Sequence, residues 1–236
     1  MKRTLLCAVT LCLTAISLTS CLGESEYLYS SLEMVNVLSS DRFKTDEGVI
    51  FNVVENSAAS MPVDIKRMMI SCDVIRNSSG KDGEYDIRLR EFAEAKVSDP
   101  VLLGEADVEK VGNDVVQVSQ GWMTKGYFNA LLKVITLKDS EQEHTIDLVF
   151  NEQRSHQDTL FFQIRHNAFG DSLEEEDNHD KAFNVAGGYF SFPVEQYIPA
   201  GTSSIVIHLD WEWYKTYDSL FTLDREACQG NITYTP

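Results

Sequence analysis

Apolar and polar residues alternate along most of this chain, which is the pattern of β-strands that bury one face. In the first half the alternation covers residues 49–54, 66–75 and 84–92. Gly, Asn, Ser and Asp gather between the last two segments, as expected of a turn. Short strands are therefore predicted from about residue 27 to residue 95, and no amphipathic helix of normal length is expected.

Longer strands are predicted in the second half. They cover residues 114–122, 127–137, 144–150, 160–166 and 204–213. In the last of these, apolar residues at alternate positions from Ile205 to Trp213 share one face. In the first, strict alternation places Val116, Val118 and Trp122 on one face. Long strands with one wet and one dry face are typical of an antiparallel β-sandwich.

The alternation is interrupted around Pro100, where residues 98–105 have the composition of a connection. The chain is long enough for two modest domains. We therefore predict an all-β protein with domains at residues 27–100 and 101–236.

The N-terminus has the features of a lipoprotein signal peptide at residues 1–20. A basic start precedes apolar residues 5–18, too short a stretch for a permanent membrane helix. The sequence Leu-Thr-Ser-Cys that follows resembles a bacterial lipobox ending at Cys21. Cys21 would then carry the lipid, residues 21–26 would form a lipidated tether, and the chain would contact the membrane through this anchor.

The residues after Cys21 bear on the destination of the protein. The second mature position is not Asp, the residue that resembles an inner-membrane retention signal in enteric bacteria. Acidic residues close to the cysteine resemble a surface-export signal of Bacteroides-type bacteria. We expect an outer-membrane lipoprotein that faces the periplasm or the cell surface.

The chain is acidic, with a formal charge of −17 that becomes −19 once Lys2 and Arg3 leave with the signal peptide. Such a protein repels nucleic acid and anionic lipid, so no nucleic-acid partner is expected. The charge either serves solubility outside the cell or attracts cations, including Ca²⁺, and basic partners.

Two cysteines, Cys72 and Cys228, remain after processing. An exported pair could form a disulfide. Alternation places Cys72 on an apolar strand face with Met68, Ile70 and Val74, where a thiol packs as a small hydrophobe. We favour the buried free thiol.

The order and spacing of several segments resemble the NigD-like lipoproteins of Bacteroides-type bacteria. The segments are residues 68–75, 84–92, Trp122 with residues 126–134, the strand opening at His144, residues 164–171 and residues 209–213. The resemblance implies an N-terminal OB-like β-barrel followed by a C-terminal antiparallel β-sandwich, in the cell envelope. It implies no catalytic residues.

The candidate site lies where a predicted strand ends in Arg165, His166 and Asn167, with Asp171 in the following loop. Alternation points Arg165 and His166 in opposite directions, so both line one pocket only if a bulge intervenes. Asp171 can cap the loop or pair with Arg165. The cluster is therefore either a polar corner that locks the loop or a binding site.

Two further groups are candidate contact residues. Glu174, Glu176 and Asp177 could supply oxygen ligands to a cation, but they lack the spacing of an EF-hand loop, so no metal site is predicted. Tyr189, beside Gly187 and Gly188, is the most plausible exposed aromatic contact.

Sequence signatures of catalysis are missing, including the nucleophile elbow, the zinc-protease helix and the phosphate loop. We expect no enzyme and no cofactor. Two hypotheses follow: a binding or scaffolding module for an unidentified partner protein, or a surface module that binds glycans or cations. Concave stacking aromatics would favour the second, and an exposed strand edge the first.

Overall fold

The computed structural model describes residues 27–62, 64–78, 80–104, 108–178, 180–217 and 220–236. The predicted signal peptide and Cys21 lie outside these residues. Within the described part of the chain, no helix combines the length and apolar character needed to cross a membrane.

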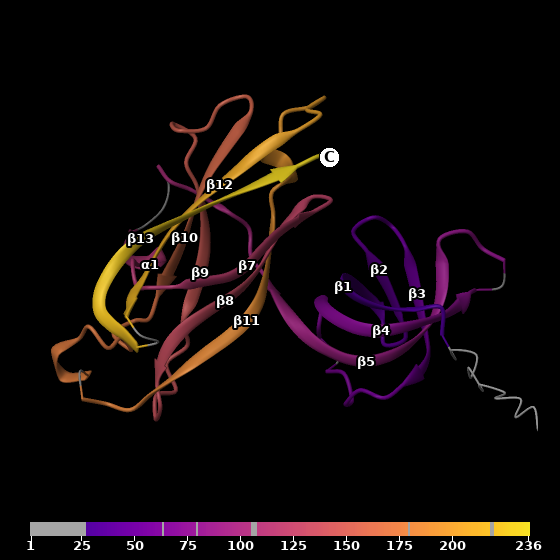
Figure 1. Ribbon diagram of the computed structural model, residues 1–236, viewed down its shortest axis with the longest axis horizontal. Coiled ribbons are helices and arrows are strands. Elements are labelled where there is room, and N and C mark those ends of the chain that lie inside the picture. Colours follow the sequence, from indigo (N-terminus) through magenta and orange to yellow (C-terminus); the bar gives the residue numbers. More distant parts are fainter. Residues whose placement is uncertain (1–26, 63, 79, 105–107, 179, 218–219) are drawn as a thin grey trace, which may run out of the picture.

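Strands make up nearly all of the regular structure (Figure 1). The strands are β1 (Tyr29–Ser39), β2 (Arg42–Thr45), β3 (Ile50–Asn56), β4 (Arg67–Asn77), β5 (Glu84–Val97), β6 (Val101–Leu102), β7 (Gln117–Thr124), β8 (Tyr127–Leu137), β9 (Thr145–Phe150), β10 (Thr159–Asn167), β11 (Phe183–Pro193), β12 (Ile205–Tyr217) and β13 (Leu220–Tyr234). Short helical segments are α1 (Val108–Val111), η1 (Glu176–Asn178) and η2 (Glu195–Tyr197). The all-β class is confirmed.

Strands β1–β5 form the N-terminal lobe. They pair in the order β3-β2-β1-β4-β5, and β3 also pairs with β5 in parallel, so the sheet closes partly on itself. Alternate residues of β4 face its interior: Met68, Ile70, Cys72 and Val74 are all fully buried, as predicted. Neither Cys72 nor the partly buried Cys228 is in a disulfide, so the alternative of a bridge is wrong.

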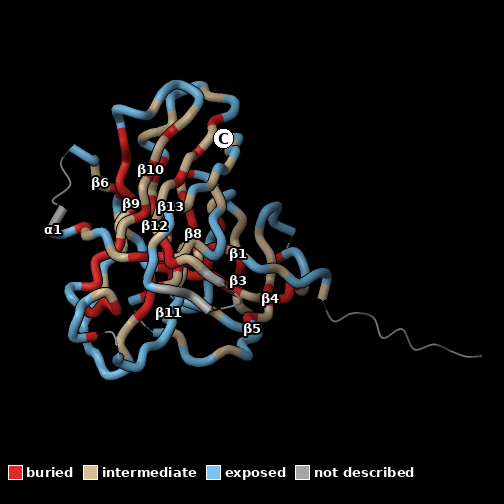
Figure 2. The backbone as a smooth tube through the Cα atoms, turned by 60° about the vertical axis from the view of Figure 1, so that its left-hand side comes forward, coloured by how far each residue is buried: buried red, intermediate tan, exposed pale blue. Residues whose placement is uncertain are grey.

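Strands β6–β13 form the C-terminal lobe, a sandwich. One layer contains β11, β8 and β7, and the other has the order β13-β12-β10-β9-β6. The inward faces of β8, β10 and β12 supply the core, including Phe128, Phe162, Ile207 and Leu209. Figure 2 shows buried positions recurring along these central strands, whereas the connecting loops are largely exposed. The β-sandwich is therefore confirmed.

Two pairings in this layer depart from the antiparallel expectation, because β6 runs parallel to β9 and β10 runs parallel to β12. Between β10 and β12 the chain passes through β11, which belongs to the opposite layer. Each crossing of the sandwich reverses the chain, so two crossings return β12 in the direction of β10.

Strand β7 carries a bulge that overturns the predicted face of Trp122. The register against β8 shifts between Val118 and Gln120, so one extra residue turns the strand over. Val116 and Val118 pack in the sandwich core, whereas Trp122 packs against a cluster of the N-terminal lobe formed by Met34, Met69 and Ala95.

The two lobes share a sheet, and a buried ion pair of the N-terminal lobe contacts the C-terminal lobe. Strand β5 leaves the N-terminal lobe and pairs with β11 in parallel at Ala95–Val97. Beside this ladder, the Arg67 guanidinium donates to both carboxylate oxygens of Asp46 at 2.7 and 2.5 Å, and both side chains are only 1% exposed. Arg67 also donates to Asn129 and Ser191 of the C-terminal lobe, which ties the lobes together.

We predict that Arg67→Met lowers the free energy of unfolding by about 3–5 kcal/mol, because it leaves Asp46 buried without its partner. Arg42→Met is the matched control, since Arg42 makes a 3.4 Å ion pair with Glu84 at the surface. Its loss should stay below about 1 kcal/mol. Urea denaturation measures both, and a similar small loss in the two variants would contradict a structural role for the buried pair.

Candidate functional site

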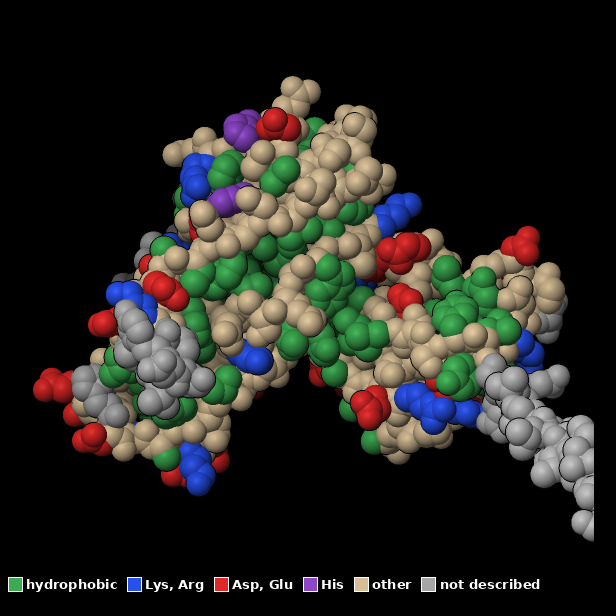
Figure 3. Space-filling model, in the orientation of Figure 1, with side chains coloured by type: hydrophobic (Ala, Val, Ile, Leu, Met, Phe, Trp, Pro, Cys, Tyr) green, Lys and Arg blue, Asp and Glu red, His purple; other side chains and the backbone are tan. Residues whose placement is uncertain are grey.

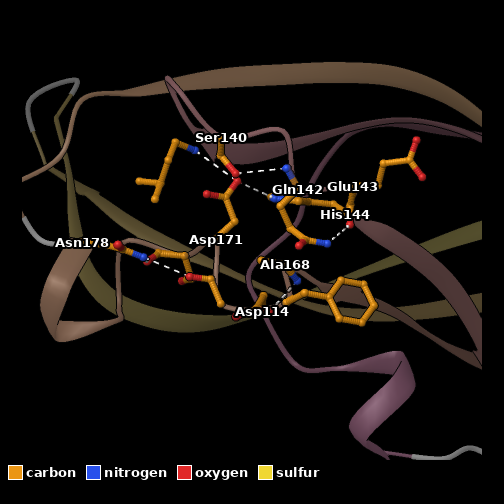
Figure 4. Close-up of polar contacts among 12 residues, drawn as sticks. Asp114, Ser140, Gln142, Glu143, His144, Ala168, Asp171 and Asn178 are labelled. Atoms are coloured by element: carbon orange, nitrogen blue, oxygen red, sulfur yellow. Dashed lines mark hydrogen bonds and ion pairs between the residues drawn. The ribbon is translucent and has the colours of Figure 1, made fainter.

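The predicted polar corner lies where β10 leaves the sandwich. Strand β9 runs antiparallel to β10, with Asn167 opposite Thr145 at their common end. This register brings His144, the residue before β9, beside His166. The loop after β10 then returns Asp171 to the same end (Figure 4).

His166 is the buried centre of the corner, with 1% of its surface exposed. Its Nδ1 lies 2.8 Å from the carbonyl oxygen of Val115, and its Nε2 lies 2.9 Å from His144 Nδ1. Because a carbonyl oxygen can only accept, Nδ1 of His166 carries a proton. Neutral His166 therefore accepts at Nε2, and His144 Nδ1 is the donor.

Asp171 completes this hydrogen-bonded series. Its Oδ2 lies 2.9 Å from His144 Nε2 and also accepts the backbone N–H of Leu137 at 3.3 Å. The side chains of His144 and Asp171 are only 7% and 4% exposed. All four ring nitrogens of the two histidines are thus occupied by structural hydrogen bonds.

Burial lowers the pKa of His166 to about 4. The hydrogen bond to Val115 opposes this decrease, and the neighbouring His144 reinforces it. His166 is consequently neutral near pH 7, in agreement with its role as an acceptor from His144.

Of the two alternatives for Asp171, pairing with Arg165 is wrong. Arg165 points to the outer face of the sheet and donates to Asn113, while His166 points inward. The predicted opposition of Arg165 and His166 is correct. Asp171 instead pairs with His144, which follows a different loop and lies 27 positions earlier in the chain.

Asn167 fixes the turn that follows the strand. Its side-chain oxygen accepts the N–H of Phe169 at 2.8 Å, and its amide nitrogen donates to the carbonyl oxygen of Lys110 at 3.0 Å. Gly112 approaches so closely that a Cβ there would lie 2.5 Å from the carbonyl oxygen of His166. This geometry is that of a locked corner with little room for a ligand.

The acidic loop, residues 174–177, divides into two parts. Glu174 forms an ion pair with Arg225 of β13, and Arg225 also reaches Glu212 at 3.1 Å. Glu176 and Asp177 are exposed in η1. Among the described residues, no group of three or more His, Cys, Asp or Glu side chains is arranged to hold a metal ion.

Tyr189 lies on the other layer of the sandwich, apart from the corner. Its ring meets that of Trp122 edge-on, with centroids 6.4 Å apart, at the junction of the two lobes. The candidate binding residues Arg165, His166, Asn167, Asp171 and Tyr189 therefore do not converge on one pocket.

A hollow that the sequence analysis did not identify opens next to Tyr189, which we name the β11 groove. Its volume is about 270 Å³, and it lies between β11 and the start of β9. Apolar side chains of Leu132, Val134, Ile146 and Phe190 line it. The lining residues are completed by Glu94, Lys96, Thr136, Gln142, His144, Ala186, Gly187, Gly188 and Tyr189. The adjacent glycines Gly187 and Gly188 were the feature of the sequence that could have pointed to this groove.

Comparison with known proteins agrees with this architecture. Residues 99–224 match the family model of the NigD-like C-terminal beta sandwich domain. The chain belongs to the NigD-like family. The match covers the whole sandwich up to the start of β13. No curated protein matches the sequence.

Solved structures of similar fold come from Bacteroides and Parabacteroides species. A protein of unknown function from Bacteroides vulgatus is 20% identical, with a TM-score of 0.59 over 88% of this chain and 92% of that one. A NigD-like immunity protein from Bacteroides caccae is 17% identical, with a TM-score of 0.59 over 87% and 97%. A candidate lipoprotein from Bacteroides fragilis is 13% identical, with a TM-score of 0.54 over 87% and 98%. These similarities concern the fold.

The buried His166 predicts a pH dependence of this NigD-like chain. Unfolded His166 binds its proton near pH 6.5 and the folded form only near pH 4. Its stabilising contribution is therefore complete above pH 6.5 and decreases as the pH falls towards 4, by on the order of 3 kcal/mol.

Carboxylates titrate in the same window, so the comparison is between variants. In His166→Gln this part of the pH dependence should disappear, while His156→Gln, which removes an exposed histidine, should keep the wild-type profile. Urea denaturation at a series of pH values gives the three curves. Parallel curves for wild type and His166→Gln would refute the neutral buried histidine.

Proposed function

We propose that this NigD-like chain is a non-enzymatic lipoprotein of the outer membrane, anchored through Cys21, that binds a partner protein. The observation that carries the binding role is the exposed edge of β11. Val185 is 51% exposed, and only Tyr189–Ser191 of this strand pair with β5. An exposed strand edge is a common docking surface for another polypeptide.

A non-enzymatic role is supported by the state of the polar residues. Catalysis requires a titratable group with access to a substrate. His144, His166 and Asp171 are the buried titratable residues of the corner, and structural hydrogen bonds occupy the ring nitrogens and the carboxylate. This arrangement favours support of the fold over chemistry.

Protein binding is favoured over the glycan- or cation-binding alternative. Sugar recognition would use an exposed aromatic face. Trp213 is buried, Trp211 packs against the sandwich core, and Trp122 and Tyr189 contact each other at the lobe junction. The acidic loop offers no clustered ligands for a cation among its described residues.

The envelope location rests on the lipobox that ends at Cys21 and on the resemblance to NigD-like lipoproteins. The candidate lipoprotein from Bacteroides fragilis supports it at the level of fold. The partial closure of β1–β5, through the pairing of β3 with β5, supports an OB-like N-terminal domain in the same proposal.

The anchor is tested by Cys21→Ala. Because the lipid attaches to the cysteine sulfur, the variant should lose incorporation of labelled palmitate and should leave the membrane fraction as a soluble or unprocessed form. Cys72→Ala is the control and should retain both properties. A Cys21→Ala protein that still carries palmitate and partitions with the membrane would contradict the lipoprotein assignment.

The binding role is tested by photo-cross-linking in cells. A photoreactive residue at Asn184, an exposed position of β11, should give an adduct with another protein, whereas one at Glu175 in the exposed loop should not. Mass spectrometry identifies the adduct. Failure of any adduct to form at Asn184, Ala186 and Val185 would overturn the proposed function.

A further inference from the structure

We propose that the β11 groove receives an extended, neutral or basic segment of the partner protein. The segment would add as a strand to the edge of β11 and place an apolar side chain over Gly188. This inference rests on the proposed function, which it deepens by naming the chemistry of the bound segment.

The first support is the direction of the backbone groups of β11. In a strand, the N–H and C=O of one residue point to the same side, and successive residues alternate. The carbonyl oxygen of Ala182, next to the strand, accepts from Lys138 on the β8 side, while that of Ser191 accepts from Ser98 on the β5 side. The backbone N–H and C=O groups of even-numbered residues of β11 therefore point to β8. Those of Val185 and Gly187 point to the opposite edge of the strand.

That edge has no partner strand along its first half within the described part of the chain. Strand β5 pairs with β11 only at Tyr189–Ser191, and its earlier residues turn into the N-terminal lobe. Figure 3 shows the surface hollowed between the two lobes. An incoming strand beside Val185 and Gly187 would extend the existing β5–β11 ladder along the same edge.

The glycine pair supplies an independent observation. Gly187 and Gly188 have ordinary backbone angles, and the pairing of β11 with β8 is continuous through them. A Cβ would meet Lys133 Cγ at 3.4 Å from Gly187 and Phe190 Cε2 at 3.6 Å from Gly188, which are ordinary contacts. Neither a turn nor crowding requires glycine here. A glycine inside a strand without such a cause is typical of a place where a ligand or another backbone approaches closely.

The groove has the shape and polarity to take an apolar side chain from an added strand. Gly188 lies on the same strand face as Phe190, and the inward side chains of Leu132 and Val134 line the hollow behind it. A strand placed at the edge of β11 would direct alternate side chains inwards, and one of them would cover this apolar surface.

The negative charge of the chain restricts which extended segments can bind in the groove. The formal charge of the chain is −17, so an acidic segment would be repelled over a long range. At the end of the groove, Glu94 and Lys96 are both exposed and of opposite sign, so the local charge is balanced. A neutral or basic segment with alternating apolar residues fits both conditions.

The test is a selection of binders from a displayed library of random peptides on the full chain, purified in detergent. Enriched peptides should alternate apolar residues and carry no net negative charge. They should bind Gly188→Ile at least about tenfold more weakly, because the new side chain fills the groove. Gln120→Ile is the control, since Gln120 is exposed on β7 outside the groove, and the affinity of this variant should stay within about twofold.

Two measurements establish the mode of binding. Methylation of alternate backbone nitrogens of the selected peptide should abolish binding if the segment pairs as a strand. Hydrogen exchange should show the amides of Val185 and Gly187 exchanging rapidly in the free protein and slowly in the complex. The amides of Ala186 and Gly188, which pair with β8, should be protected in both.

The results separate this inference from the proposed function. Enriched peptides that bind Gly188→Ile as well as wild type, that tolerate backbone methylation, or that leave the Gly187 amide unprotected would overturn strand addition. Failure to enrich any peptide, or enrichment of acidic ones only, would do the same. A protein adduct at Asn184 would leave the proposed function intact in all of these cases.

Discussion

The buried ion pair between Arg67 and Asp46 is the interaction on which the arrangement of the two lobes depends. Removing two charges from water costs several kcal/mol each, so such a pair is tolerable only when its remaining hydrogen-bonding capacity is also satisfied. Here the acceptors come from both lobes: Asn36 from the first, Asn129 and Ser191 from the second. The Tyr127 ring lies 3.9 Å from the guanidinium carbon and covers it further. Satisfying one cation therefore requires the lobes to meet in one orientation.

That orientation determines which residues of β5 pair with β11. The ladder at Ala95–Val97 lies next to the Arg67 network, and the preceding residues of β5 curve away to complete the N-terminal lobe. The opening beside β11 is thus a product of two competing demands on β5, which belongs to both sheets. Because β5 pairs within the N-terminal lobe before it reaches β11, the first half of the β11 edge has no neighbouring strand in the described part of the chain.

Strands with one clearly apolar face could be predicted from the sequence, because alternation reports burial directly. Strands β4, β8, β10 and β12 are of this kind. Strand β13 was missed, since its described residues are mostly exposed or partly exposed and show no clean alternation. The bulge between Val118 and Gln120 was missed as well, because alternation within one strand cannot reveal an unpaired residue opposite another strand.

The polar corner shows a similar limit. The sequence correctly separates Arg165 from His166, since that depends only on strand geometry. The partner of Asp171 depends on the register of β9 against β10, which brings His144 to the end of the sheet. In the same way, Glu174 belongs to a run of acids, and its ion pair with Arg225 depends on the position of β13, which the residues around Glu174 do not reveal. The β11 groove is defined by two layers of the sandwich and by β5, and no local pattern encodes that combination.

The two free thiols have a consequence for how the protein matures. Cys72 lies in the core of the N-terminal lobe and Cys228 on β13 of the sandwich, so they cannot meet in the folded chain. Burial raises the pKa of the Cys72 thiol to about 12, and the reactive form of cysteine is the thiolate. The core thiol is therefore inert towards oxidants and towards exchange with other disulfides. The fold of the two lobes therefore does not depend on a disulfide between Cys72 and Cys228.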